Sequence, residues 1–147
     1  MTEINTFEGY SAVTFTEIPA NVGFESAVLK AVAEAGINID MISQTPPKSD
    51  RVSFGFSFSD DDIPALLKIM SKITSDKNVT PFVTSGNVKI RILSDEMCDQ
   101  AGFAAKVFEL IDSVSAEVLM VSTGNDEICL LVPESGSDNI SEVLKNL

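Results

Sequence analysis

The apolar residues follow two spacings along the chain, and these spacings predict strands and helices. In "RVSFGFSFS", residues 51–59, apolar side chains at alternate positions predict a strand with one buried face. From Phe24 onward, apolar residues recur at steps of three and four, as on one side of an amphipathic helix. We predict further strands at residues 2–9, 11–18, 37–43, 78–86, 87–94, 116–122 and 127–133. We predict helices with apolar stripes over residues 24–35, 63–73, 103–114 and 140–147.

Local signals refine three of these elements. Gly36 follows the first helical stripe and is a natural C-terminal stop, since glycine readily adopts the left-handed conformation found at helix ends. The run "SDDD", residues 59–62, is acidic enough to suggest a metal cluster. We interpret it instead as a helix cap, because Ser59 or Asp60 can accept backbone N–H groups and carboxylates favour the positive end of a helix. The stripe of Phe54, Phe56 and Phe58 is predicted to be core.

The chain contains an internal repeat. Asn21–Gln44 aligns without a gap with Gln100–Thr123, and five of the 24 positions are identical, including Gly23 with Gly102. The flanking elements repeat in the same order, strand–helix–strand–strand–helix. The repeat therefore predicts two structural copies of one unit.

The element order predicts an α+β fold made of two ferredoxin-like βαββαβ domains. This fold needs a fourth strand in each copy, and residues 78–86 supply it for the first. The second copy ends on a helix, whereas residues 2–9 form a spare strand at the start of the chain. We therefore expect domain 1 at residues 10–86 and domain 2 at residues 2–9 plus 87–147. Each would have a four-stranded antiparallel sheet with helices on one face.

Composition narrows the classes of function. A hydrophobic fraction of 44% suits a packed core, and a net charge of −12 argues against nucleic-acid or anionic-membrane partners. No apolar run approaches the roughly 18 residues of a membrane span, and the first residues do not resemble a signal peptide. We expect a cytoplasmic protein whose two cysteines, Cys98 and Cys129, are reduced thiols, one in a loop and one in a buried strand.

The residues needed for common catalytic sites are missing. The sequence has no histidine, which excludes Ser-His-Asp and Cys-His catalysis and removes the commonest metal ligand. No glycine-rich phosphate-binding motif occurs either. We predict no catalytic residue, no metal and no cofactor. An enzyme that uses only carboxylates or a thiol remains a minor alternative.

Two stretches carry a family resemblance. "EIPANVGFESAVLKAVAEAGINIDMISQ" followed by "VSFGFSFS" resembles the first ACT domain in the regulatory region of aspartokinases. "AGFAAKVFELI", "VLMVST" and "EICLLVP" are similar to the paired second ACT domain. Nothing in the chain corresponds to the Lys-Phe-Gly-Gly type motif of the kinase domain. The resemblance implies a non-catalytic tandem ACT protein or a separate regulatory subunit, with an aspartokinase-like enzyme as its possible partner.

The resemblance also implies a ligand and a homodimer. The ligand would be a small amino acid such as lysine or threonine, bound at the interdomain or dimer seam. A helix N-terminus suits its α-carboxylate, and a glycine there permits close approach. The loop residues of the implied site are Asn21, Val22, Gly23 and Phe24 in the first copy and Gln100, Ala101 and Gly102 in the second. Its strand residues are Asn38, Ile39, Asp40, Met41 and Gln44 in the first copy and Glu117, Val118, Ser122 and Thr123 in the second.

Other interpretations of these residues stay open. Gly23 and Gly102 would also serve simply as tight turns into helices. Asn38, Asp40 and Gln44 are absent from the second copy, so they serve either recognition or solvation. The loop "PANVG" lacks the acidic residue and proline usual in the family, which fits a structural or protein-interaction module that has lost its ligand.

Overall fold

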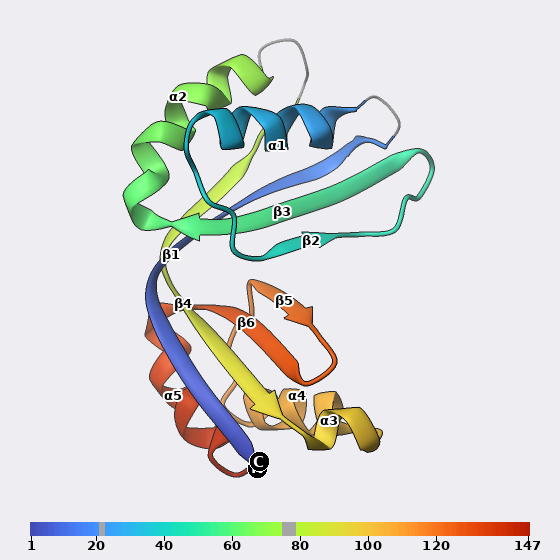
Figure 1. The fold of residues 1–147 in the computed structure, drawn as a ribbon, viewed down its shortest axis with the longest axis vertical. Helices are drawn as coiled ribbons and strands as arrows, with labels where there is room; N and C mark the ends of the chain where they lie inside the picture. The colour runs from blue at the N-terminus through green and yellow to red at the C-terminus, as the bar shows by residue number, and fades with distance from the viewer. Residues whose placement is uncertain (21–22, 75–78) are drawn as a thin grey trace. The chain divides into compact units, whose positions relative to one another are not determined.

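A computed structural model describes residues 1–20, 23–74 and 79–147 (Figure 1). Two compact units are present: unit 1 comprises Met1–Glu8 and Gly86–Leu147, and unit 2 comprises Gly9–Ser85. Strands β1 (Thr2–Pro19) and β4 (Phe82–Ser94) each contribute residues to both units. Each unit therefore contains one part of β1 and one part of β4.

The predicted breaks within these two long strands are wrong. Residues 2–9 and 11–18 form the single strand β1, and residues 82–86 continue into 87–94 as β4. Of the predicted strand 78–86, residues 79–81 precede β4, and residue 78 lies outside the described ranges. Gly9 and Gly86 have φ angles of 80° and 67°. A glycine with positive φ inside a strand marks a bulge or bend, which leaves the strand continuous. The sequence analysis predicted each of these glycines as the last residue of a separate strand.

Unit 2 has the predicted strand and helix order. Its strands lie in the order β2-β3-β1-β4, and its helices α1 and α2 lie on the same side of the sheet (Figure 1). Strand β3 runs antiparallel to both β1 and β2. The elements between β1 and β4 are α1 (Phe24–Glu34), β2 (Ile42–Gln44), β3 (Arg51–Ser59), the 3-10 helix η1 (Asp60–Asp62) and α2 (Ile63–Thr74).

An aromatic cluster forms the core of unit 2. Phe15 of β1 stacks on Phe54 of β3, with ring centroids 5.1 Å apart, and Phe24 of α1 meets Phe15 edge-on at 5.5 Å. Phe54, Phe56 and Phe58 are at most 2% exposed, so their predicted place in the core is confirmed. Offset and edge-on ring pairs add to the stabilisation that burial itself provides.

Unit 1 is assembled from both ends of the chain. Its strands lie in the order β1-β4-β6-β5, and the hydroxyls of Thr2 and Ser94 lie 3.1 Å apart between β1 and β4. Its core joins β4 and β6 to helices α4 and α5 through Ile90, Leu130 and other apolar residues. The remaining elements are α3 (Glu96–Asp99), α4 (Phe103–Ser113), β5 (Met120–Thr123), β6 (Glu127–Pro133) and α5 (Glu134–Leu144).

The α+β fold class is confirmed, and the differences concern element ends. Strands β2 and β5 are shorter than predicted, since residues 37–41 and 116–119 make only scattered ladder bonds, such as Asp40 N to Ser57 O at 2.9 Å. Helix α5 begins before its apolar stripe, and α3 was not predicted. The predicted cap is confirmed, because Ser59 Oγ accepts the Asp61 N–H at 3.2 Å. The predicted stop is also confirmed, since α1 ends before Gly36, whose φ is 77°.

Candidate functional site

Helices α1 and α4 begin in the same way. Gly23 and Gly102 are their N-cap residues, with φ angles of 67° and 99°. The first intrahelical bonds run from Ala27 N to Gly23 O at 3.0 Å and from Lys106 N to Gly102 O at 3.1 Å. The N–H groups of a helical first turn have no intrahelical acceptor, and the helix dipole gives this end a partial positive charge. A glycine cap offers no side-chain oxygen to these groups, so the two helix starts can accept an anionic group.

The loop that enters α1 begins beside the turn between β2 and β3. Pro19 pairs with Arg51, and Ala20 N donates to Asp50 O at 2.9 Å. Asn21 and Val22, which belong to the predicted site, lie outside the described residues. Gln44 pairs with Phe54, three positions along β3 from Arg51, or about 10 Å. The described residues of this loop, Ala20 and Gly23, are here called the ligand loop, and Ala20 lies at the same end of the unit 2 sheet as Gln44.

Asn38 and Asp40 lie toward the opposite end of unit 2. The eleven residues of α1 span about 16 Å between Gly23 and the helix end that precedes Asn38. Asp40 N donates to Ser57 O, six positions along β3 from Arg51, or about 20 Å. One unit thus brings Gln44 near the ligand loop and keeps Asn38 and Asp40 away from it.

Three predicted site residues of unit 2 serve packing. Phe24 and Met41 are each 4% exposed, and Ile39 packs partly buried against the unit 2 core. Met41 is also held by its N–H, which donates to Ser57 Oγ at 2.9 Å. Among the predicted strand residues of the unit 2 site, here called the strand wall, the exposed polar side chains are those of Asn38, Asp40 and Gln44.

The corresponding residues of unit 1 are distributed in the same manner. Gln100, Ala101 and Gly102 are exposed before α4, and Val118 packs against the unit 1 core. Ser122 and Thr123 pair with Cys129 and Ile128 of β6. Glu117 lies beyond the other end of α4, so α4 separates it from Gly102 as α1 separates Asn38 from Gly23. Glu117 lines a cavity of about 330 Å³ together with Ser115, Ser135 and Asn139.

The sheet of each unit has a short strand at its edge. Strand β2 is last in the strand order of unit 2, and β5 is last in that of unit 1. Among the described strands, each has a neighbour on one side only. Ile42 of β2 is 51% exposed and Val121 of β5 is 38% exposed. Such edges present backbone N–H and C=O groups that can pair with another strand.

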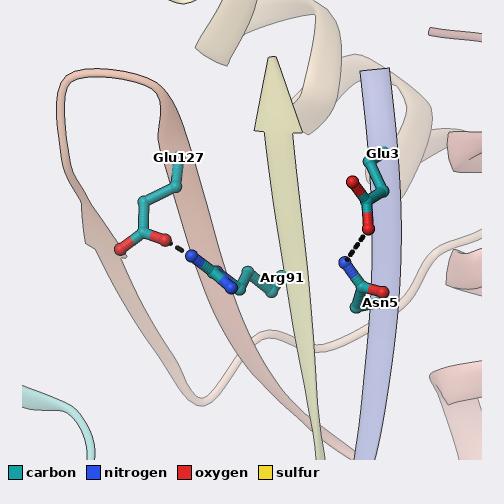
Figure 2. A network of polar contacts seen from close by, with 4 residues as sticks. All are labelled: Glu3, Asn5, Arg91 and Glu127. Carbon is teal, nitrogen blue, oxygen red and sulfur yellow. Dashed lines mark hydrogen bonds and ion pairs between the residues drawn. The ribbon is translucent and has the colours of Figure 1, made fainter. Parts of the chain in front are cut away.

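An ion pair on unit 1 was not identified from the sequence. Arg91 Nε donates to Glu127 Oε2 at 2.7 Å between β4 and β6, and Asn5 Nδ2 donates to Glu3 Oε1 at 3.1 Å on β1 (Figure 2). The hydrogen bond to Glu127 raises the pKa of the Arg91 guanidinium. The strand register places Arg91 opposite Cys129, two pairs away from the Leu93–Glu127 pair. The contact between Arg91 and Glu127 could not be predicted without knowing this alignment of β4 with β6.

Other candidate chemistry is sparse in the described residues. Cys98 is exposed and Cys129 is buried, and neither forms a disulfide. Cys98 lies in α3, so its predicted place in a loop is wrong. Within the described ranges, no three side chains of the metal-ligating types lie close enough together to hold a metal ion. No helix in the part of the chain that the structure describes has the length and apolar character needed to cross a membrane.

Comparison with known proteins bears out the predicted resemblance. Residues 22–74, which run from the ligand loop to the end of α2, match the ACT domain. An aspartokinase of Geobacillus stearothermophilus is 29% identical over 122 residues, which are 83% of this chain and 29% of that protein. An aspartokinase of Corynebacterium efficiens is 25% identical over 147 residues, which are 98% of this chain and 35% of that protein. The chain thus spans about three tenths of the length of these relatives.

Two solved structures have the same fold along almost their whole length. The regulatory subunit of aspartate kinase from Thermus thermophilus, in a ligand-free form, has a TM-score of 0.87 at 20% identity, covering 97% of this chain and 95% of that chain. A putative C-terminal regulatory domain of aspartate kinase from Porphyromonas gingivalis has a TM-score of 0.73 at 18% identity, covering 99% and 96%. The chain therefore resembles aspartokinases in sequence, and in fold it resembles proteins described as regulatory parts of aspartate kinase.

Proposed function

We propose that this chain is a non-catalytic regulatory protein that senses a small amino acid, such as lysine or threonine, through two ACT-type units. The observation that carries the proposal is the start of α1 at the left-handed Gly23, inside the segment that matches the ACT domain. The α-carboxylate of the ligand binds the first-turn N–H groups of α1, where the helix dipole favours negative charge. The same arrangement at Gly102 offers a second site.

The strand side of the site combines Gln44 of one copy of the chain with Asp40 of a second copy. Asp40 lies about 20 Å from the ligand loop along its own sheet, whereas Gln44 lies about 10 Å from it. If the β2 edges of two copies pair antiparallel about Ile42, Asp40 of one copy lies opposite Gln44 of the other. The homodimer thereby brings the carboxylate of Asp40, an acceptor for an α-ammonium group, toward the loop end of the neighbouring sheet.

Ligand binding regulates by favouring the paired arrangement. A ligand held by residues of two copies has different affinity for the paired and unpaired states, and only such a difference can shift their populations. A partner enzyme then responds to the change. The likeness to proteins described as regulatory parts of aspartate kinase supports an aspartokinase-like partner.

A thermal-shift screen against the twenty amino acids tests this function. A ligand at 100 times its Kd stabilises the folded state by about 2.7 kcal/mol. For a chain of this length that raises Tm by roughly 5–11 °C, in a concentration-dependent manner. No shift with any amino acid at millimolar concentration would refute the sensor function and favour the alternative, a structural or protein-interaction module that has lost its ligand.

A further inference from the structure

Strand β1 contains a bulge just before the ligand loop. Phe15 pairs with Phe54 and Ile18 pairs with Val52, so Thr16 and Glu17 together oppose Ser53 alone. Two residues opposite one define a β-bulge, which bends the strand and redirects the chain beyond it. Glu17 has a φ of 54°, a left-handed conformation that is unfavourable for a residue other than glycine.

Side chains of β3 satisfy the backbone of the bulge. The Glu17 N–H donates to Ser53 Oγ at 3.0 Å, and Arg51 Nη1 donates to Glu17 O at 3.2 Å. Both backbone groups of Glu17 are therefore bonded by side chains instead of by the ladder of β3. A strained backbone conformation persists only where its surroundings fix it, and these two bonds supply that constraint.

Ser53 also joins the bulge to the segment that follows β2. Its N–H donates to Thr45 Oγ1 at 3.0 Å, and its carbonyl accepts the Thr45 N–H at 2.8 Å. Thr45 directly follows Gln44, the predicted site residue at the loop end of β2. One serine thus connects β1, at the point where it turns toward the ligand loop, with the strand wall of the proposed site.

The chain leaves the bulge directly into the ligand loop. Pro19 pairs with Arg51, and Ala20 N donates to Asp50 O at 2.9 Å, three residues after Glu17. The direction set at Glu17 therefore decides where Ala20 lies and where the approach to Gly23 begins. Strained backbone next to a binding loop is characteristic of functional sites, where it holds the loop in its bound form.

We propose that Ser53 and Arg51 are positioning residues for amino-acid binding: they hold the β1 bulge and thereby fix the position of Ala20 relative to the end of β2. This inference rests on the proposed function for its ligand and on the bulge for its geometry. Neither residue contacts the ligand; each acts through the backbone of Glu17. The Ser53 hydroxyl, more than the size of the side chain, carries the effect.

Backbone amide exchange tests the positioning without any ligand. In Ser53→Ala we expect the Glu17 and Ala20 amides to exchange several-fold faster. The Glu17 N–H loses its acceptor, Ser53 Oγ, and the backbone from Glu17 to Ala20 is then held less firmly. In Ser53→Thr, which retains the hydroxyl, both rates should stay near those of the unsubstituted chain. The Ile90 amide in unit 1 serves as the internal control for global stability. Unchanged exchange at Ala20 in Ser53→Ala would overturn the inference.

Calorimetric titration with L-lysine and with L-threonine tests the consequence for binding. We expect Ser53→Ala to raise the Kd roughly three- to tenfold, which is the effect of losing about one hydrogen bond. Ser53→Thr and the exposed control Ser71→Ala should have a Kd close to that of the original chain. Arg51→Gln, a milder surface change, should weaken binding in the same direction. Binding by the original chain that Ser53→Ala and Arg51→Gln leave unaltered overturns the inference alone. No binding by the original chain, together with faster exchange at Ala20 in Ser53→Ala, contradicts the proposed function and supports the geometry.

Discussion

Replacing Gly23 by alanine separates a structural role for this glycine from a role in binding. Gly23 has a φ of 67°, and an added Cβ would meet nothing within 4 Å, so the cost of alanine arises from the backbone conformation and not from a clash. The left-handed conformation costs an L-residue about 1–2 kcal/mol. For a chain of 147 residues, this loss lowers Tm by roughly 2–8 °C.

Gly36 supplies a matched control for this substitution. Its φ is 77°, its added Cβ would also meet nothing within 4 Å, and it lies just beyond the opposite end of α1. Gly36→Ala should therefore lose about the same 1–2 kcal/mol of folding free energy. The two variants share a cost in stability and differ in their distance from the proposed carboxylate site.

Calorimetric titration with an amino acid identified in the thermal-shift screen measures the difference. We expect Gly23→Ala to raise the Kd at least about fivefold, since the methyl group and the altered cap disturb the N–H groups that bind the carboxylate. Gly36→Ala should bind as the original chain does. Equal affinities in both variants would refute the assignment of the α1 start as the binding site, whatever their Tm values.

Further substitutions test the core, the strain, the edge and the charges. Phe15→Ala should cost about 3–5 kcal/mol in urea unfolding, because Phe15 is fully buried and contacts both Phe24 and Phe54; a loss below about 1 kcal/mol would contradict the described core. Glu17→Gly should raise stability by about 1 kcal/mol by relieving the left-handed conformation, and a destabilised variant in the same unfolding assay would show that Glu17 is not strained. Ile42→Asp should shift sedimentation toward the monomer by placing like charges in the proposed β2 pairing, whereas an unchanged dimer would exclude that edge. The pKa of Arg91 is raised in the folded state, so the stability that the charged side chain adds is present below the pKa of the unfolded chain and is lost only as pH rises through the pKa of the folded chain. We therefore expect Arg91→Gln and the original chain to show the same pH profile of stability between about pH 6 and 9 in thermal unfolding.

Side-chain periodicity predicted the faces of the elements well. The alternation in 51–59 identified the buried side of β3, and the three- and four-residue steps after Phe24 identified the buried side of α1. Such patterns depend only on local geometry, which the sequence records directly. The repeat added the pairing of Gly23 with Gly102, and both glycines begin helices.

Features that depend on register or on distance along a strand were not predictable. Gly9 and Gly86 were each predicted to end a strand, yet β1 and β4 continue through them. The bulge at Glu17 involves Ser53, which is 36 residues away, and no local signal connects the two. Asn38 and Gly23 are only fifteen residues apart in the chain, but α1 lies between them and separates them. A sequence pattern identifies which residues are polar and exposed; the fold decides which of them meet.

Chemical-shift mapping by NMR during titration with L-lysine and with L-threonine tests whether one amino acid contacts both the start of α1 and the end of β2. We expect saturable shifts of the amides at the start of α1, together with those of Asp40 and Gln44. Their common midpoint would show that one ligand contacts both the ligand loop and the strand wall. A full titration of both amino acids that leaves the amides of Gly23 and Gln44 unmoved would contradict it.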